Sequence, residues 1–325
     1  MGFVICTLFE GNYHYGVAVL INSLYQKGYR GDVFAGYRGA IPPWAASAKE
    51  NPSLQWKNAR TFEVETDLKL HFLPLETDYH LTNYKPDFML GLWHGPAAKA
   101  LGMFYFDPDI IVTRNWTLFE EWINCGVALS EDVNSPLSEL HPRRVAWRRY
   151  FGNMDIQLQF KDQIYVNGGF IGLAKSDIDF LEFWKKIQEA MAPEIGGLNR
   201  SIFKAEDLKM LEQSGGGPFM PFLKTDQDAL NATIEAGENK ISYLGKEGMS
   251  FGNGFHMMRH ALGAPKPWDW SFFRQTLIGV PPRKVDIDYW KLAGFPIQAY
   301  KPGKINLKKL AIKLSLAVGR FYRKT

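Results

Sequence analysis

The chain has 325 residues, of which 46% are hydrophobic and 22% are charged, a composition typical of a folded soluble protein that excludes a disordered or fibrous one. Its two cysteines, Cys6 and Cys125, are too few for a disulfide framework or a cysteine-based metal site, which favours a reducing compartment. The formal net charge is +4, but residues 304–325 carry seven Lys and Arg and no acid, so residues 1–303 sum to −3. This distribution argues against a general nucleic-acid binder and for an anionic partner near the tail.

The first residues predict a strand and not a signal peptide, because residues 1–6 have no basic region before the apolar run. No stretch of the chain has the length and the freedom from charge that a transmembrane helix needs. We therefore expect a cytoplasmic protein.

The first third of the chain alternates between strand and helix patterns, which predicts an α/β fold with a mainly parallel sheet. A strand over residues 3–8 leads through a polar loop to a helix that begins at residue 17 and ends near residue 28. A strand over residues 30–37, a helix around residues 43–51 and a strand around residues 61–64 follow. Neither a G-x-G-x-x-G motif nor a Walker lysine follows the first strand, which disfavours a dinucleotide or P-loop site.

Two aspartates one residue apart follow the apolar run Phe104-Tyr105-Phe106. Pro108 restricts the turn between Asp107 and Asp109, and two carboxylates that face one opening would repel each other unless a cation lies between them. Because Asp and Pro are also ordinary turn residues, a plain turn at the end of a strand explains the motif equally well.

Further polar segments follow along the chain. Lys85 lies at the start of a predicted helix, and its position alone favours a solvated lysine slightly over a phosphate contact. The strand over residues 127–132 ends in Ser130-Glu131-Asp132. The basic segment 142–150 fits a solvated helix face better than a site for an anionic acceptor or a lipid phosphate. In the strand over residues 165–173, Gly168 and Gly169 predict a bulge or a close approach by a ligand.

The next third contains a predicted helix over residues 180–191 and an irregular, Gly-rich loop over residues 193–221. Asp226-Gln227-Asp228 then opens a helix, where the helix dipole alone accounts for the charges. His256 and His260 are four residues apart, but the surrounding Gly and Pro argue against a helical pair of metal ligands.

In this order the short motifs resemble glycosyltransferase family 8, which includes glycogenin and the bacterial lipopolysaccharide galactosyltransferases. Its members are metal-dependent, retaining GT-A enzymes that usually take UDP-sugars. The matching segments are Asn12-Tyr13 after the first strand, Asp107-Pro108-Asp109, Asn167-Gly168-Gly169, and the pair formed by Asp226-Gln227-Asp228 and His260-x-x-Gly263-x-x-Lys266-Pro267-Trp268. The resemblance implies a GT-A catalytic domain over residues 1–270 and a C-terminal extension over residues 271–325.

The resemblance also implies site roles. Asp107, Asp109 and His260 would hold one metal ion, and two carboxylates with one imidazole suit Mn²⁺ better than Mg²⁺. Lys266 and Lys85 would add positive charge at the donor phosphates, and Gly263 would let the backbone approach them.

The remaining implied roles concern the base and the sugar. Glu10 and Asn12 would contact the base, in a pocket lined by residues 7–9 that includes Thr7. Asp226 and Gln227 would face the donor sugar as catalytic residues. Other donor-binding positions are Tyr13, Phe106, Asp107, Asn167, Gly168 and Gly169.

Two departures from the family and two alternative functions stay open. Glu10-Gly11 stands where many relatives have an aspartate, so uracil recognition is less certain than sugar transfer. Asn167-Gly168-Gly169 replaces the commoner Asn-Ala-Gly. A scaffold that kept the fold without turnover would share these motifs, and a nucleotidyltransferase would also use an Asp-x-Asp metal site.

The tail over residues 304–325 predicts a basic amphipathic helix that binds an anionic membrane surface. Its apolar positions at helical spacing are Leu307, Leu310, Ala311, Leu314, Val318 and Phe321. The alternative is a helix that packs on the catalytic domain with a basic outer face. With a lipid-linked glycan as acceptor, the interpretation is a peripheral enzyme on the inner face of a membrane.

Overall fold

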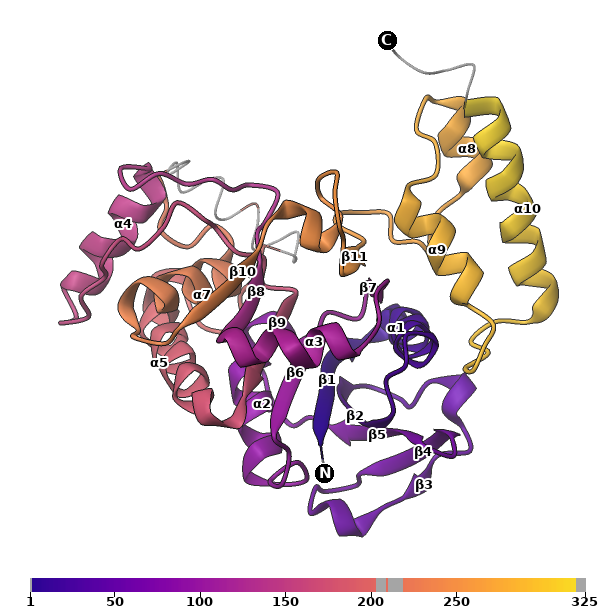
Figure 1. Cartoon of the computed structure of the whole chain (residues 1–325), viewed down its shortest axis with the longest axis horizontal. Helices are drawn as coiled ribbons and strands as arrows, with labels where there is room; N and C mark the ends of the chain where they lie inside the picture. Colours follow the sequence, from indigo (N-terminus) through magenta and orange to yellow (C-terminus); the bar gives the residue numbers. More distant parts are fainter. Residues whose placement is uncertain (1, 203–208, 210–218, 320–325) are drawn as a thin grey trace.

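The computed structural model describes residues 2–202, 209 and 219–319, and it is built on one large mixed sheet (Figure 1). The strands of this sheet lie in the order β10 (Ile241–Leu244), β8 (Val127–Ser130), β9 (Phe170–Ala174), β6 (Gly102–Phe106), β1 (Phe3–Glu10), β2 (Gly31–Arg38), β5 (Leu68–Pro74), β4 (Arg60–Glu65) and β3 (Lys49–Glu50). The four central strands β6, β1, β2 and β5 are parallel, whereas β9, β4 and β3 pair antiparallel with their neighbours. The predicted α/β class is confirmed.

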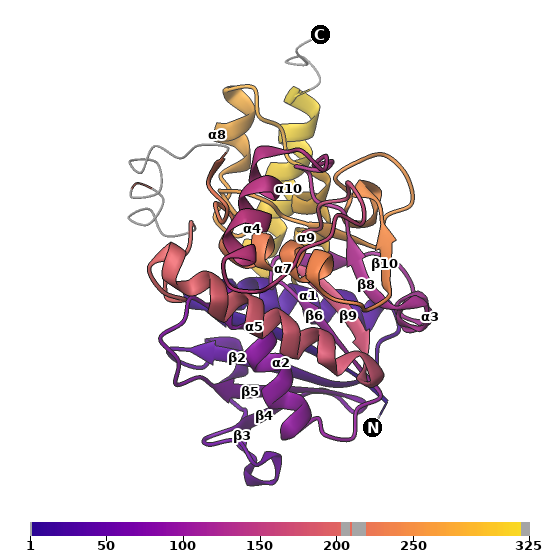
Figure 2. The same cartoon turned by 90° about the vertical axis from the view of Figure 1, so that its left-hand side faces the viewer.

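Strand β1 is apolar on both faces because helices cover both sides of the sheet. Val4, Cys6 and Leu8 point into one core, and Ile5 and Phe9 point into the other, as the two-residue period of a strand requires. The first core also contains side chains of α2 (Lys85–His94), α5 (Ile178–Ile195) and α7 (Thr225–Ala236), and the second contains those of α1 (His14–Gln26) and α3 (Thr117–Trp122). Figure 2 shows α2 and α5 lying across their face of the sheet.

A small second sheet stands beside the large one. It pairs β7 (Ile110–Val112) antiparallel with β11 (Met258–His260). His260 ends β11 and His256 lies in the irregular segment before it, so the two do not share a helix, as their Gly and Pro content predicts. This pairing joins the segment after β6 to a segment far along the chain.

The C-terminal helices α8 (Phe272–Leu277), α9 (Lys284–Leu292) and α10 (Pro302–Gly319) pack around a third apolar cluster next to α1 (Figure 1). Asn22 of α1 donates to the carbonyl oxygens of Leu292 and Ile297, at 2.7 and 2.8 Å. The division of the chain at residue 270 stays a prediction. Within the described residues, no helix combines the length and the apolar character that crossing a bilayer would demand.

Two local expectations differ from the structure. The helix predicted around residues 43–51 is wrong: two 3-10 turns, Pro43–Ala45 and Pro52–Leu54, flank the short strand β3 there. Each turn begins with a proline at its first position, and β3 takes its backbone partners from β4, so tertiary pairing overrides the weak helical preference. Strand β5 was not expected, although it forms a hairpin with the expected strand β4.

Candidate active site

A cavity of about 540 Å³ opens where β1 and β6 end. Its lining includes Leu8, Phe9 and Glu10 from the end of β1 and Asp107 and Asp109 from the turn after β6. Ligands of open α/β sheets bind at this position, outside the carboxyl ends of neighbouring parallel strands.

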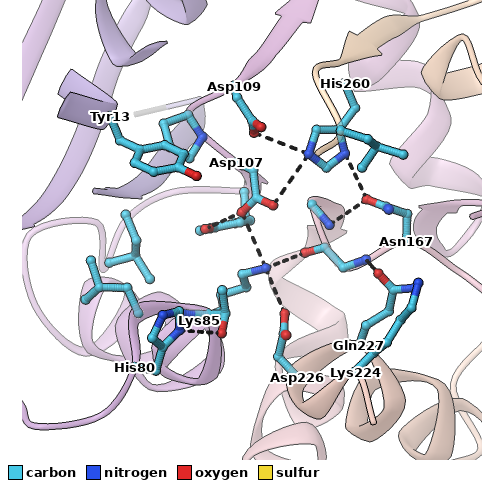
Figure 3. Close-up of a pocket in the computed structure, with 18 of the residues that line it drawn as sticks. Tyr13, His80, Lys85, Asp107, Asp109, Asn167, Lys224, Asp226, Gln227 and His260 are labelled. Atoms are coloured by element: carbon cyan, nitrogen blue, oxygen red, sulfur yellow. Dashed lines mark hydrogen bonds and ion pairs between the residues drawn. The ribbon is translucent and has the colours of Figure 1, made fainter. Parts of the chain in front are cut away.

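Three side chains with metal-ligand chemistry meet in this cavity (Figure 3). One ligand atom each from Asp107, Asp109 and His260 lies within 4.8 Å of the others. The Nε2 atom of His260 is 3.2 Å from Asp109 Oδ1 and 3.9 Å from Asp107 Oδ2. The pairing of β11 with β7 sets His260 opposite Ile110, which brings the histidine beside the aspartate that precedes that strand.

Hydrogen bonds and a close helix contact hold the turn between the two aspartates. The backbone N–H of Asp107 donates to the Gly169 carbonyl at 2.7 Å, and that of Ile110 donates to the Asp107 carbonyl at 3.0 Å. A Cβ atom on Gly16 of α1 would lie 2.3 Å from the Pro108 carbonyl oxygen. Only glycine therefore lets α1 pack against this turn.

Gly169, like Gly16, has no room for a side chain, and it contacts the turn at Asp107 from another side. A Cβ atom there would lie 2.6 Å from His260 Cε1 and 2.9 Å from Asp107 Oδ2. The interpretation of this glycine as a point of close approach is correct, and the atoms that approach it are those of the metal-ligand cluster.

Positive charge surrounds the buried carboxylate of Asp109. Burial would raise the pKa of Asp109, but His260 and Lys266 together hold it well below its ordinary value. The Lys266 ammonium donates to Asp109 Oδ2 at 2.5 Å and to the Ala261 carbonyl at 2.9 Å. The site is thus built to keep Asp109 ionised.

The three side chains fit a divalent cation. Two carboxylates and an imidazole form a donor set that Mn²⁺ accepts, and two like charges this close need a cation to compensate them. Gly169 leaves free the space around His260 and Asp107 that a larger residue would fill.

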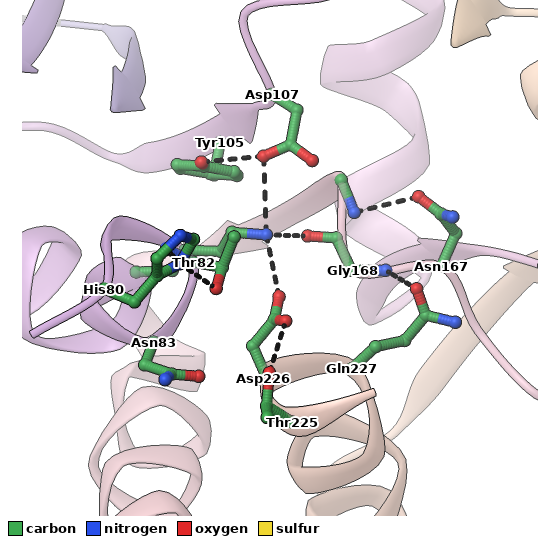
Figure 4. A network of polar contacts seen from close by, with 12 residues as sticks. His80, Thr82, Asn83, Tyr105, Asp107, Asn167, Gly168, Thr225, Asp226 and Gln227 are labelled. Carbon is green, nitrogen blue, oxygen red and sulfur yellow. Dashed lines mark hydrogen bonds and ion pairs between the residues drawn. The ribbon is translucent and has the colours of Figure 1, made fainter. Parts of the chain in front are cut away.

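Lys85 links the metal-ligand cluster to the start of α7 (Figure 3), and Figure 4 shows its acceptors Asp107, Gly168 and Asp226. Its ammonium is 2.7 Å from the Gly168 carbonyl oxygen, 3.0 Å from Asp226 Oδ2 and 3.4 Å from Asp107 Oδ1. Lys85 is only 1% exposed, so the expectation of a solvated lysine is wrong. Since an ammonium has three N–H donors, these three acceptors match all the hydrogen bonds that Lys85 can donate.

Asp226 and Gln227 lie side by side at the N-terminus of α7. Burial raises the pKa of Asp226, and the nearby Lys85 ammonium opposes this change. Gln227 Oε1 accepts from the Gly168 N–H at 3.2 Å. Its Nε2 atom is buried without a partner among the described residues, which leaves its NH₂ group able to donate to a ligand.

Most of the predicted site residues line the one cavity. They are Glu10, Tyr13, Lys85, Asp107, Asp109, Asn167, Gly168, Gly169, Asp226, Gln227, His260, Gly263 and Lys266. Thr7 and Phe106 are fully buried in the sheet, and Asn12 is exposed. None of these last three is among the residues that line the cavity, and their donor-binding roles stay predictions.

The cavity also contains residues that sequence reasoning did not assign to it. Among them are His80, Thr82, Asp132 and Lys224. Asp132 carried a signal, since it closely follows an apolar strand of the same sheet. Thr82 lies in the 3-10 helix Leu81–Tyr84 and Lys224 in the turn before α7, and neither segment has a pattern that predicts a site.

The basic segment on α4 (Pro142–Gly152) has a structural role. Arg143 and Arg144 are buried and pair with Asp228 and Glu235 of α7. The expectation of a solvated face is therefore wrong for these two arginines. Their guanidinium groups connect α4 to α7 through ion pairs with these two carboxylates.

The comparison with solved structures finds glycosyltransferases. The bifunctional glycosyltransferase WbbM in its apo form matches 95% of this chain with a TM-score of 0.52 and 12% identity, and this chain spans 52% of that structure's length. The galactosyltransferase LgtC in complex with donor and acceptor sugar analogues matches with a TM-score of 0.49 and 16% identity, over 94% of this chain and 99% of that one. An active-site mutant of LgtC gives 0.48 and 14% over the same shares. No family model matches the chain, and the search of curated proteins finds no significant match.

At this level of identity, the match to WbbM shows a shared fold. The resemblance inferred from the short motifs is confirmed for the fold: the chain has the fold of a glycosyltransferase.

Proposed function

We propose that this chain is a metal-dependent glycosyltransferase that moves a sugar from a nucleotide-sugar donor to a glycan or lipid-linked glycan. The observation that carries the proposal is the meeting of Asp107, Asp109 and His260 in the cavity that also holds Asp226 and Gln227. UDP-sugars are the donors that the family resemblance favours, with retention of the anomeric configuration.

Asp107, Asp109 and His260 would hold Mn²⁺, with Mg²⁺ as the alternative. When bound, a divalent ion supplies positive charge that stabilises the departing nucleoside diphosphate. Lys266 lies beside Asp109 and can turn its ammonium toward a phosphate. Gly263, with φ +70° and open space around it, lets the backbone approach the same group.

Asp226 and Gln227 would act at the donor sugar. The buried carboxylate of Asp226 is oriented by Lys85, and the unpartnered NH₂ group of Gln227 can donate to a sugar oxygen. Asn167, Gly168 and Gly169 complete this side of the cavity. Glu10, which pairs with Arg38 at 2.8 Å, and Tyr13 lie on the side proposed for the base.

We also propose that the enzyme binds the inner face of a membrane through its C-terminal helices. Leu307, Leu310 and Leu314 of α10 are 66%, 53% and 50% exposed, whereas Ile305 and Ile312 face the third core. An outward apolar stripe with neighbouring lysines suits an anionic lipid surface. Phe321 and the last basic residues lie outside the described residues.

The test of the enzymatic proposal is nucleotide release. Purified protein with MnCl₂ and a panel of nucleotide sugars should release UDP or another nucleoside diphosphate, and Asp109→Ala should abolish the release. Asp67→Ala, at an exposed turn aspartate that pairs with Arg30, is the control and should keep full turnover.

Three outcomes would contradict the proposal. Pyrophosphate in place of a nucleoside diphosphate would indicate a nucleotidyltransferase. Metal-dependent nucleotide binding without turnover would indicate a scaffold. Normal turnover in Asp109→Ala would remove the metal assignment.

A further inference from the structure

A buried carboxylate, that of Asp132, lies next to the proposed metal-ligand cluster without belonging to it. Asp132 follows β8 and is 2% exposed, and Asn167 beside it is 3% exposed. The Asn167 side chain bonds to Asp132 at one end and lies against His260 at the other (Figure 3). Asp132 is not a proposed metal ligand, so its charge needs another explanation.

Backbone pairing holds these two residues in register. The N–H of Asn167 donates to the Ser130 carbonyl at 2.9 Å, and the N–H of Asp132 donates to the Tyr165 carbonyl at 2.8 Å. Glu131 and Val166 form the bridge between the two segments. Asp132 and Asn167 therefore face each other from a rigid antiparallel pair, and their contact does not depend on a flexible loop.

Only one orientation of the Asn167 amide is consistent with its hydrogen bonds. The backbone N–H of Gly169 can only donate, and it lies 2.9 Å from one end of the Asn167 amide, so that end is the oxygen. The other end is the NH₂ group, and it donates to Asp132 Oδ2 at 2.6 Å. An ionised carboxylate accepts this bond and cannot favour the reverse orientation.

The same oxygen determines the state of the histidine. Asn167 Oδ1 lies 3.1 Å from His260 Nδ1, and because this oxygen can only accept, Nδ1 must carry the hydrogen. In the neutral ring the lone pair is then on Nε2, the atom that lies 3.2 Å from Asp109. A metal needs this lone pair.

We propose that Asp132 is a positioning residue: by orienting the Asn167 amide, it holds His260 in the tautomer that presents Nε2 to the metal. The proposal rests on the metal site of the proposed function. Partners of this kind, which lie behind a ligating histidine, contribute to affinity although they never touch the ion.

Asp132→Asn tests the proposal because it removes the charge with little change in shape. An amide at position 132 that still accepts from the Asn134 N–H, now 2.9 Å from Asp132 Oδ1, turns its own NH₂ group toward Asn167. The NH₂ group of Asn167 would then face a second NH₂ group at 2.6 Å, so we expect the Asn167 amide to flip, although the flip breaks the bond from the Gly169 N–H. Its NH₂ group then faces His260, and the hydrogen of the ring moves to Nε2. We expect the affinity for Mn²⁺ alone to fall by about 10- to 100-fold.

The tautomer itself can be measured without metal or donor, in spectra recorded at a pH where the His260 ring carries a single hydrogen. Long-range ¹H–¹⁵N correlation spectra of labelled protein distinguish protonated from unprotonated ring nitrogens, and His260→Asn identifies the signals of His260. Wild type should show hydrogen on Nδ1, and Asp132→Asn should show hydrogen on Nε2. Calorimetric titration with MnCl₂ gives the affinity of each variant.

A reciprocal exchange should restore both properties. In Asp132→Asn/Asn167→Asp, the amide at position 132 accepts from Asn134 and donates to the carboxylate at position 167. That carboxylate still accepts from Gly169 N–H and from His260 Nδ1. We expect the double variant to recover the Nδ1–H tautomer and most of the lost Mn²⁺ affinity.

Asn134→Ala is the matched control, because it removes a side chain that bonds to the same Asp132 carboxylate without touching Asn167. It should behave as wild type, and thermal melting should show that all variants are folded. An unchanged His260 tautomer in Asp132→Asn, or a double variant no better than the single one, would overturn the proposal. Absence of Mn²⁺ binding by the wild type would instead overturn the metal site, while the spectra still decide the role of Asp132.

Discussion

At the scale of single residues, Lys266 has two proposed partners that it cannot satisfy together. In the structure its ammonium binds Asp109, whereas the proposed function requires it at a donor phosphate. A divalent ion that binds Asp109 competes with this ammonium. Metal binding would therefore release Lys266 toward the donor, and the two ligands should bind cooperatively.

Lys266→Met should separate the competition with the metal ion at Asp109 from the contact with the donor phosphate. Without the competing ammonium, the affinity for Mn²⁺ alone should rise roughly tenfold, the equivalent of one charge-assisted hydrogen bond. The affinity for UDP in the presence of Mn²⁺ should fall by a similar factor, as measured by calorimetry.

Lys224→Met provides the control for Lys266. Lys224 lines the same cavity, but its ammonium lies 4.0 Å from the carboxylate of Asp132, which is not a proposed metal ligand. Its substitution should leave the affinity for Mn²⁺ unchanged. A Lys266→Met variant that binds Mn²⁺ more weakly than wild type would contradict the competition.

At the scale of secondary-structure elements, the contact between α1 and the turn after β6 positions both aspartates. Gly16→Ala should push the Pro108 carbonyl away, since the new methyl group would lie 2.3 Å from it. We expect a loss of about 1–3 kcal/mol in the free energy of unfolding and weaker Mn²⁺ binding. Urea unfolding and calorimetry measure the two effects.

Gly152→Ala is the matched control for Gly16, because no atom lies within 4 Å of a Cβ at this helical glycine. It should be neutral or slightly stabilising. Equal effects of the two substitutions would mean that the contact with Pro108 does not matter.

The contact between α4 and α7 predicts a dependence of stability on pH. Burial raises the pKa of Asp228 to about 6 from an ordinary 3.8, although Arg143 lowers it in part. Between these values the native protein holds a proton that the unfolded chain has lost. The stability that this proton provides is therefore lost as the pH rises from 4 to above 6, by roughly 3 kcal/mol in total.

Asp228→Asn should remove this dependence, because an amide at this position can accept from the Lys224 N–H and donate to the Tyr165 oxygen without titrating. Urea unfolding of both proteins at pH 4.5, 5.5 and 7.5 measures the difference. As the pH rises, the free energy of unfolding of the variant should increase relative to that of the wild type. A constant difference across this range would contradict the prediction.

At the scale of the whole molecule, the C-terminal helices present an apolar surface away from the sheet. Phe273 and Leu277 of α8 are 49% and 51% exposed, and α8 packs beside α10 (Figure 1). The outward leucines of α10 were described above. The alternative, a helix that packs on the protein with a basic outer face, agrees with the burial of Ile305 and Ile312 in the third core. The exposed Leu307, Leu310 and Leu314 add apolar side chains to the outer face. Deleting the tail would also remove Ile305 and Ile312 from the third core, so substitutions on the surface test the membrane more cleanly.

Leu310→Glu/Leu314→Glu should lower partitioning onto vesicles that contain phosphatidylglycerol at least about tenfold, because two apolar side chains no longer enter the interface. Co-sedimentation measures the bound fraction. Leu101→Glu, at a leucine that is 64% exposed before β6, should bind as wild type does. Unchanged binding of the double variant would contradict the proposed membrane surface.

The sequence by itself determined the local features of this protein. Alternating apolar patterns predict strands near β1, β2 and β4. The strand predictions succeed because periodicity and turn chemistry act between near neighbours along the chain. The grouping of Asp107, Asp109, His260 and Asp226 in one site was implied only by the family resemblance of the short motifs.

Only the tertiary structure decided what these residues contact. The pairing of β11 with β7 places His260 at Asp109, and the fold buries Lys85 between two carboxylates where the sequence favours a solvated lysine. Arg143 and Arg144 were likewise expected on a solvated face, and only the fold shows that they pair with carboxylates of α7. The physical reason is the same in each case: burial and pairing depend on segments that are distant in sequence, and no local pattern encodes them.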